Sequence, residues 1–253
     1  MSTKPFLIIT NGPTGSGKSG LVTKVINRYN LSEDYTKLLI DDLVENNDHY
    51  KDAIDNYIQQ TCDSKRELCD ALSERLKNPD DDTYRAFGDM YFETREGYYC
   101  GAVDEKAKCS DWLDGLLGAA ISQGQNIVFE TVGTHYVDWL IKMLKGREYR
   151  VIYAFTLLDF CENVRRNKIR ASSQMEDYIK DRTKPAPRLP DVREESFKMT
   201  VNKIGQNLMQ LMGRKLFGQL DDVESIIVFN NTNRLIEVLY DSDTTESMSD
   251  LVR

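Results

Sequence analysis

The stretch that decides the fold is "NGPTGSGKS", Asn11 to Ser19, which directly follows the apolar run "FLIIT" at residues 6–10. Its glycines, lysine and final serine match the spacing G-x-x-x-x-G-K-[ST]. Glycines allow backbone conformations that turn successive N–H groups toward one point, and a following helix adds the positive end of its dipole. The stretch therefore predicts a phosphate-binding loop between a buried strand and a helix.

The residues of this loop predict a site for ATP and Mg²⁺. Lys18 is expected to reach the terminal phosphates, and the Ser19 hydroxyl is expected to ligate Mg²⁺. The residues expected to bind the nucleotide are Gly12, Pro13, Thr14, Gly15, Ser16, Gly17, Lys18 and Ser19. The motif alone leaves open whether the nucleotide serves a kinase, a switch or a motor.

The composition of the 253-residue chain is typical of a soluble globular protein, with 40% hydrophobic and 29% charged residues. The net charge of −8 argues against nucleic acid or a membrane surface as a general partner, because both are polyanions. No apolar run approaches the roughly 18 residues of a membrane span. The five cysteines follow no metal-ligand spacing, so we expect reduced thiols and a cytoplasmic protein.

Short apolar runs alternate with helical stretches along the chain, as is typical of βαβ units. The runs are "FLIIT", "KLLIDD", "NIVFET", "RVIYAFTLLD" and "SIIVFNN". Helices are expected at residues 17–29, 110–123, 138–144 and 194–211. The alternation predicts an α/β fold with three layers, α/β/α, and a mostly parallel central sheet.

The sequence predicts one domain over residues 1–240 with additions around its core. The polar, helix-prone insertion at residues 45–108 is either a cap over a cleft or an ordinary packed helical pair. Residues 163–193 are expected to form a lid. The run "LIEVLYD" at 235–241 predicts a strand that closes a hairpin, and the acidic tail at 241–253 is expected to be mobile.

Two short strings argue against a switch and a motor. A guanine-specific switch needs an Asn-Lys-x-Asp string, whereas the strings at Asn167 and Asn202 read "NKIR" and "NKIG". A motor ATPase normally has a strand of four apolar residues that ends in Asp, often Asp-Glu, whereas "IVFE" ends in Glu130 and continues with Thr131. A phosphotransferase is therefore the leading interpretation.

Acids at the ends of two predicted strands are candidates for the acceptor side, because ligands of open α/β sheets bind beyond the carboxyl ends of the strands. Asp41 and Asp42 close the run "LLIDD", and one of them is expected to face the site. The alternative is a pair that caps the next helix. Glu130 is expected to contact acceptor hydroxyls or to hold Mg²⁺ through water, unless it is a surface acid.

The predicted lid is strongly basic. Residues 165–193 contain six arginines and three lysines against four acids, a balance of 9 − 4 = +5 in a chain of net charge −8. Arg166 and Arg170 are one helical turn apart and share a face. The prolines after them favour an extended, locally stiff segment, and they are Pro185, Pro187 and Pro190. Arginines placed over phosphates stabilise transition-state charge and exclude water.

These motifs together resemble the zeta-toxin family of P-loop kinases, which is similar in fold to small-molecule kinases such as the chloramphenicol-modifying kinase. The matching stretches are "LIITNGPTGSGKS", "LLIDDLVENNDHY" with its histidine, "SQGQNIVFETVGT", the arginine-bearing lid and "IIVFNNTNRLIEVLYD". The sequence departs from the family where a glycine often follows the glutamate, since that glycine is displaced here to Gly133.

The resemblance implies a role for individual residues. Asp41 or Asp42 is implied to be the catalytic base, and Glu130 and Thr131 to contact the acceptor. It further implies that Arg165 or Arg166 begins the lid and that Arg188 in "APRLP" contacts the phosphates. Bacterial members phosphorylate a UDP-activated amino sugar, so a nucleotide sugar is one candidate acceptor and a nucleoside is another.

The leading hypothesis is a kinase that moves the γ-phosphate of ATP to a hydroxyl of a small molecule. One alternative is a 5′-hydroxyl polynucleotide kinase, in which the basic segment grips a strand. Another is a nucleotide-gated binding protein with slow hydrolysis, in which residues 45–108 grip a protein partner. A protein inhibitor is left open by the sequence.

Overall fold

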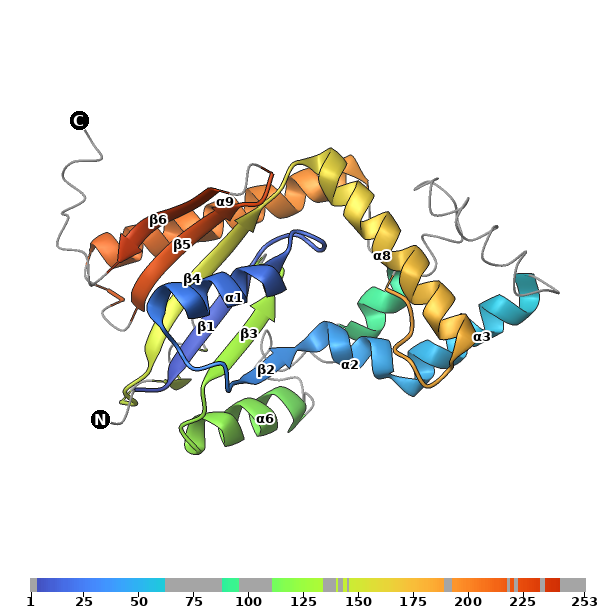
Figure 1. The fold of residues 1–253 in the computed structure, drawn as a ribbon, viewed down its shortest axis with the longest axis horizontal. Helices are drawn as coiled ribbons and strands as arrows, with labels where there is room; N and C mark the ends of the chain where they lie inside the picture. The colour runs from blue at the N-terminus through green and yellow to red at the C-terminus, as the bar shows by residue number, and fades with distance from the viewer. Residues whose placement is uncertain are drawn as a thin grey trace. The chain divides into compact units, whose positions relative to one another are not determined.

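The computed structural model describes most of the chain as helices and strands connected by short segments (Figure 1). The described residues are 4–61, 88–95, 111–133, 140, 143–144, 146–188, 193–217, 219–220, 223–232 and 235–241. The strands are β1 (Phe6–Asn11), β2 (Thr36–Leu39), β3 (Ile127–Thr131), β4 (Arg150–Leu157), β5 (Val223–Asn230) and β6 (Leu235–Asp241). The helices include α1 (Lys18–Tyr29), α2 (Ile40–Asn46), α3 (Asp48–Thr61), α6 (Asp111–Ser122), α8 (Phe160–Lys180) and α9 (Glu194–Leu216).

The strands form one sheet in the order β2-β3-β1-β4-β5-β6. β1 pairs in parallel with β3 and β4, and β4 pairs in parallel with β5. β6 pairs antiparallel with β5, so the predicted closing hairpin is confirmed. The mostly parallel sheet and the α/β fold predicted from the sequence are both confirmed.

β1 lies inside the sheet, which explains its continuous run of apolar residues. Every residue from Phe6 to Asn11 is buried. Phe6 and Ile8 pack with the apolar face of α1 and with residues of β3, β4 and β5 in one core cluster. Figure 1 shows α1 in front of the sheet and α9 behind its β5–β6 side.

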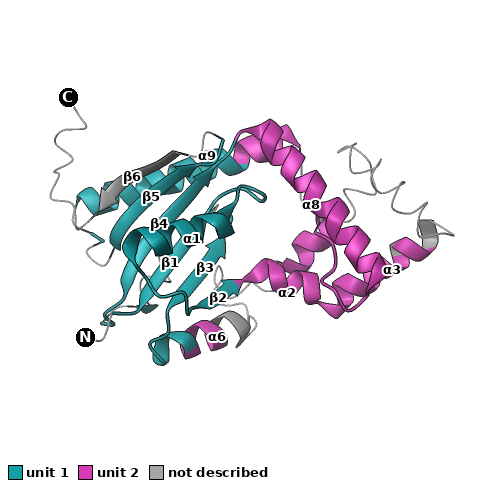
Figure 2. Ribbon diagram, in the orientation of Figure 1, with its two compact units in different colours: residues 1–38, 120–158, 200–253 teal, residues 39–119, 159–199 magenta. Residues whose placement is uncertain are grey.

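The chain divides into two compact units (Figure 2). Unit 1 consists of residues 1–38, 120–158 and 200–253 and contains the sheet with the phosphate-binding loop. Unit 2 consists of residues 39–119 and 159–199 and contains α2, α3 and α8. Both units are assembled from segments that lie far apart in the sequence.

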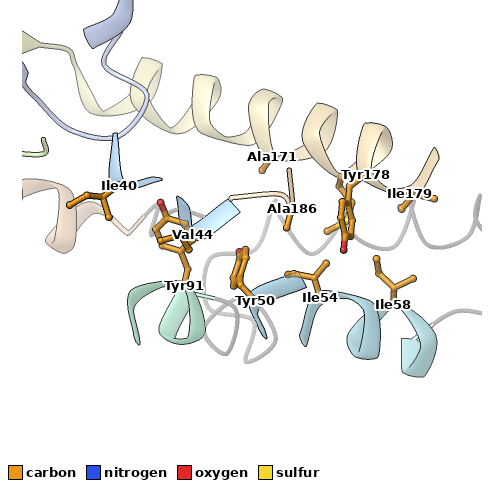
Figure 3. Packing of buried hydrophobic residues seen from close by; sticks show 11 residues of the cluster. Ile40, Val44, Tyr50, Ile54, Ile58, Tyr91, Ala171, Tyr178, Ile179 and Ala186 are labelled. Carbon is orange, nitrogen blue, oxygen red and sulfur yellow. The ribbon is translucent and has the colours of Figure 1, made fainter. Parts of the chain in front are cut away.

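Unit 2 has its own hydrophobic core (Figure 3). Aromatic and branched side chains of α2 and α3 pack there against α8 and against Tyr91 of the helical segment at 88–95. The larger members are Tyr50, Tyr91 and Tyr178, and the rings of Tyr50 and Tyr91 meet edge to face at 5.7 Å. The described helices of the predicted insertion therefore pack into a core with α8.

The second strand is shorter than the sequence predicts. β2 ends at Leu39, and Asp41 and Asp42 lie in the first turn of α2 instead of at the end of a strand. Ile40 and Val44 are both buried and stand four residues apart, which is the spacing of a helical face. Acids in a first turn are also favoured by the helix dipole.

Other boundaries shift by smaller amounts. β4 ends at Leu157, because the Asp159 side chain caps α8 by accepting from the N–H of Glu162 at 2.9 Å. α9 continues five residues beyond its predicted end, to Leu216. The helix expected at 138–144 and the tail after residue 241 lie largely or wholly outside the described residues.

Among the described helices, none has the length and apolarity that crossing a membrane requires. Cys161 is an exposed free thiol, and the other four cysteines lie outside the described residues.

Candidate nucleotide site

The loop between β1 and α1 has the backbone of a phosphate cradle. The N–H of Ser16 donates to the carbonyl oxygen of Pro13 at 3.1 Å and closes a tight turn. Gly15 and Gly17 have φ values of 81° and 92°, a left-handed conformation that favours glycine. Gly17 precedes the first residue of α1, so the loop leads directly into the positive end of that helix.

Lys18 folds back over this loop. Its Nζ donates to the carbonyl oxygens of Gly12 at 2.9 Å and Pro13 at 3.2 Å, and the residue is only 7% exposed. An ammonium held in this way is a preplaced positive charge at the cradle. Its three donors can be redirected to phosphate oxygens without moving the backbone.

Ser19 and Glu130 meet at the carboxyl ends of the strands. The Ser19 Oγ donates to Glu130 Oε2 at 3.4 Å, and Glu130 is buried. A hydroxyl and a carboxylate are the hard oxygen ligands that Mg²⁺ prefers, so this pair fits the ion expected from the sequence. Thr131 follows Glu130 on β3, and its Oγ1 accepts from the N–H of Gly133 at 3.2 Å.

Gly12 is packed too tightly for any side chain. A Cβ built there would stand 1.9 Å from Thr156 Oγ1 and 3.0 Å from the backbone oxygen of Thr156. Gly20 on α1, in contrast, has nothing within 4 Å of such a Cβ. Close packing therefore requires a glycine at position 12, whereas the space around position 20 admits a side chain.

Replacing these glycines is expected to change stability in opposite directions. Gly12→Ala forces β4 away from the loop and should lower the free energy of unfolding by about 1–3 kcal/mol. Gly20→Ala removes backbone entropy from the unfolded chain and should raise the free energy of unfolding by roughly 1 kcal/mol. Urea unfolding of both variants measures the two changes, and equal signs would contradict the packing described for Gly12.

In unit 2, Asp41 belongs to a buried cluster of charges. Arg188 donates from Nη1 to Asp41 Oδ2 at 2.5 Å and from Nε to Glu45 Oε1 at 2.7 Å. Its Nη2 also donates to Glu45 Oε1. All three residues are buried, and the positive charge of the arginine makes burial of the two carboxylates tolerable.

Polar side chains from other elements complete this cluster. The hydroxyl of Tyr91 donates to Asp41 Oδ1 at 2.5 Å, and Arg95 Nε stands 3.6 Å from the same oxygen. Gln174 donates to Glu45 Oε2 at 3.3 Å and accepts from the N–H of Arg188 at 3.1 Å. Asp41 is therefore held in one orientation by donors on both of its oxygens.

The charges in the cluster shift one another's protonation. Burial raises the pKa of Glu45 above its ordinary value, although Arg188 opposes the shift. Burial lowers the pKa of Arg170, and the nearby Arg188 lowers it further. Burial opposes the charge of Arg188, but Asp41, Tyr91 and Glu45 outweigh burial and raise its pKa.

The remaining site candidates lie outside these two groups. Asp42 is exposed on α2, and its carbonyl oxygen accepts from the Asn46 side chain at 2.7 Å. Arg165 and Arg166 both pair with Glu162 near the start of α8, at 2.6 and 2.7 Å. Hydrogen bonds from these two arginines lower the pKa of Glu162 to about 2.

The structure thus joins Lys18, Ser19 and Glu130 in unit 1, and Asp41 with Arg188 in unit 2. Sequence reasoning missed the other polar members of both groups. Around Asp41 these are Glu45, Tyr91, Arg95 and Gln174, and in unit 1 they are Thr156 and Asn231, which bond to Ser16 of the loop. Glu45 stands one helical turn after Asp41, so a helix over residues 40–46 would have indicated it. The others reach their partners across long sequence separations, for which local patterns carry no signal.

A solved structure from the PezAT chromosomal toxin-antitoxin system of the human pathogen Streptococcus pneumoniae matches this architecture. It covers 99% of this chain and 78% of its own chain, with a TM-score of 0.53 and 17% sequence identity. The chain therefore shares its fold with this protein of the PezAT system. The fold implied by the sequence resemblance is therefore confirmed.

Two further structures match at a TM-score of 0.29 each, and no conclusion rests on them. One is a candidate kinase from Chloroflexus aurantiacus, with 15% identity over 74% of this chain and 84% of its own. The other is TT1252 from Thermus thermophilus, with 16% identity over 84% of this chain and 98% of its own. No family model and no curated protein matches the chain.

Proposed function

We propose that the protein is a kinase that transfers the γ-phosphate of ATP to a hydroxyl group of a small molecule. The observation that carries the proposal is the phosphate loop with Lys18 folded over it and the Ser19–Glu130 pair beside it. This combination supplies a cation and a metal site for one set of phosphates, which is what phosphoryl transfer requires of a protein.

Ser19 and Glu130 are the residues that would hold Mg²⁺. The bound ion would neutralise charge on the phosphate oxygens during transfer. Lys18 would bind the terminal phosphates directly, and the N–H groups of the loop would orient them. Lys18, Ser19 and the loop would thus place the donor but would not select the acceptor.

Asp41 is the better candidate for the base that takes the proton of the acceptor hydroxyl. A general base must be held in position, and Asp41 is fixed by Arg188 and Tyr91, whereas Asp42 is exposed. In the structure both Asp41 oxygens accept hydrogen bonds. An acceptor hydroxyl must therefore displace one of these donors or use a remaining lone pair of the carboxylate.

Each candidate lid arginine is now paired with an acidic side chain, which it would have to leave in order to contact phosphates. Arg188 would contact phosphates only after loosening its bonds to Asp41 and Glu45, so binding of phosphate at Arg188 would also release Asp41. Arg165 and Arg166 would need to leave Glu162 in the same way. A small-molecule acceptor, such as a nucleotide sugar or a nucleoside, would meet Glu130 and Thr131 at the end of β3.

The test is product analysis after incubation of the purified protein with γ-labelled ATP, Mg²⁺ and a metabolite extract. Label is expected on a new small molecule, and Asp41→Asn is expected to slow its appearance by about 10²–10⁴-fold. Asp42→Asn is the matched neighbour and is expected to retain the wild-type rate. The unfolding midpoint of each variant separates lost chemistry from lost folding.

Other results of this experiment would favour one of the alternative functions or another catalytic base. Release of free phosphate alone, or no turnover, would favour the nucleotide-gated binding protein. Label on added oligonucleotides with a 5′-hydroxyl would favour the polynucleotide kinase. Loss of transfer in Asp42→Asn with full activity in Asp41→Asn would move the base to Asp42.

A further inference from the structure

Ser16, in the middle of the phosphate loop, is held by two side chains from distant parts of unit 1. Its Oγ lies 2.5 Å from Thr156 Oγ1 on β4. Its carbonyl oxygen accepts a hydrogen bond from Asn231 Nδ2 at 2.7 Å. Neither contact belongs to the G-x-x-x-x-G-K-[ST] pattern, and each comes from a strand end that follows the loop by more than a hundred residues.

The Asn231 contact determines which way one peptide group of the loop points. No described peptide bond is cis. In a trans peptide the carbonyl and the N–H of the next residue point in opposite directions. Because the Ser16 carbonyl points to Asn231, the Gly17 N–H points away from Asn231.

Gly17 has the freedom to lose this orientation. Its backbone is left-handed, with φ 92° and ψ 31°, and glycine adopts other conformations at little cost. The Ser16–Gly17 peptide could therefore rotate if nothing held it. The Asn231 side chain supplies the restraint that the glycine itself does not.

Asn231 is well placed for this role because its own backbone is fixed. Its N–H donates to the carbonyl oxygen of Leu157 at 2.8 Å, directly after Thr156 on β4. Since a carbonyl only accepts, the side-chain NH₂ of Asn231 must be the group that faces Ser16. A carboxamide anchored in this way holds the loop to the ends of β4 and β5.

Thr156 restrains the same residue from the side. Its hydroxyl donates to the carbonyl oxygen of Asn11 at 3.3 Å. A hydroxyl has one proton, so Ser16 Oγ then donates to Thr156 Oγ1. The side chain of Ser16 is thus fixed by a residue of β4, and its carbonyl by a residue of the turn after β5.

We propose that Asn231 and Thr156 are positioning residues that turn the Gly17 N–H toward the phosphates of the bound nucleotide. The proposal rests on the proposed function, because it assumes that this loop binds ATP. It adds two residues, outside the motif, on which the preformed cradle depends. A preformed donor costs nothing to orient when the nucleotide binds.

The first test compares Asn231→Ala with Asn126→Ala by titration calorimetry with MgATP. Asn126 is a matched control, since its Nδ2 also donates to a backbone carbonyl, that of Asp34, at 2.8 Å. It precedes β3 and lies at the other end of the strands. Its Oδ1 also accepts from the N–H of Phe6, so the control loses more hydrogen bonds than the test variant.

Asn231→Ala is expected to weaken MgATP binding by about tenfold to a hundredfold. This is the effect of losing the hydrogen bond from the Gly17 N–H to a charged phosphate. Asn126→Ala is expected to bind MgATP within about twofold of the wild type. The amide proton of Gly17 provides a structural readout by NMR. It is expected to shift on addition of MgATP in the wild type and in Asn126→Ala, but not in Asn231→Ala.

Thr156 is tested by a pair of substitutions. Thr156→Val keeps the shape without the hydroxyl and is expected to weaken MgATP binding by about tenfold. Thr156→Ser keeps the hydroxyl and is expected to restore most of the affinity. If Thr156→Val does not fold, Asn231→Ala still decides the proposal, because Asn231 is only partly buried.

Three outcomes would overturn the proposal. Wild-type affinity and a wild-type Gly17 shift in Asn231→Ala would show that the peptide keeps its orientation unaided. Equal loss of affinity in Asn231→Ala and Asn126→Ala would show general destabilisation instead. Failure of the wild type itself to bind MgATP would refute the proposed function, and the inference with it, whereas the first two outcomes leave the proposed function standing.

Discussion

Replacing Arg188 with methionine is expected to lower the free energy of unfolding by about 3–5 kcal/mol. Arg188 is the cation that pairs with both Asp41 and Glu45 inside unit 2. Without it two carboxylates four residues apart would remain buried, with fewer donors to compensate their charge. Chemical denaturation at neutral pH measures the loss.

The pH dependence of this loss identifies its cause. Burial raises the pKa of Glu45, and removal of Arg188 takes away the charge that opposes that shift. A carboxyl whose pKa is raised in the folded state stabilises the fold at pH values below its unfolded pKa of 4.5. This stabilisation is lost as the pH rises through the folded-state pKa. Arg188→Met should therefore be less destabilised near pH 5 than near pH 8.

Arg165→Met is the control for this experiment. Arg165 is exposed and pairs with Glu162 within the first turns of α8, where solvent screens the interaction. Its removal should leave the unfolding curve unchanged at both pH values. A deficit in Arg188→Met that does not vary with pH would point to lost packing of the arginine stem instead of buried charge.

Lys18→Met is expected to reduce phosphate transfer by about 10²–10³-fold while leaving the protein folded. The variant loses two hydrogen bonds to loop carbonyls. The substitution also removes a buried positive charge from the positive end of α1. Because a positive charge at that end is unfavourable, its removal favours folding. Because the two changes offset, the free energy of unfolding should change by less than about 1 kcal/mol.

The matched control is Lys24→Met on the same helix. Lys24 is exposed, and its Nζ lies 5.2 Å from the centre of the Phe229 ring. The substitution Lys24→Met removes the same charge from α1 as Lys18→Met. Transfer of label from ATP and binding of MgATP should stay within about twofold of the wild type, as is usual for exposed positions. An equal fall in both variants would mean that net charge, and not the position of Lys18, governs binding.

The residues proposed for the donor half of the candidate site could be identified from the sequence because they are local. One loop, a strand before it and a helix after it contain Gly12, Lys18 and Ser19 within a few residues. The proximity of Ser19 and Glu130 follows from one further rule, that the carboxyl ends of parallel strands meet at one edge of the sheet. The structure places the two side chains in contact.

The environment of Asp41 could not be predicted in the same way. Its place in α2 was obscured because "LLIDD" reads as the end of a buried strand, while the helical spacing of Ile40 and Val44 spans only one turn. Arg188 reaches it across 147 positions of sequence. Hydrophobic periodicity describes a single element, so it carries no information on which distant side chains meet.

The place of β1 in the sheet has a consequence for the synthesis of the chain. This strand leaves the ribosome before the other described strands of the sheet, and both of its neighbours, β3 and β4, come more than a hundred residues later. At a rate of roughly 5–20 residues per second, its apolar residues wait several seconds without a partner strand. During that interval the nascent chain exposes a row of unpaired backbone groups, which is a substrate for chaperones and a starting point for aggregation.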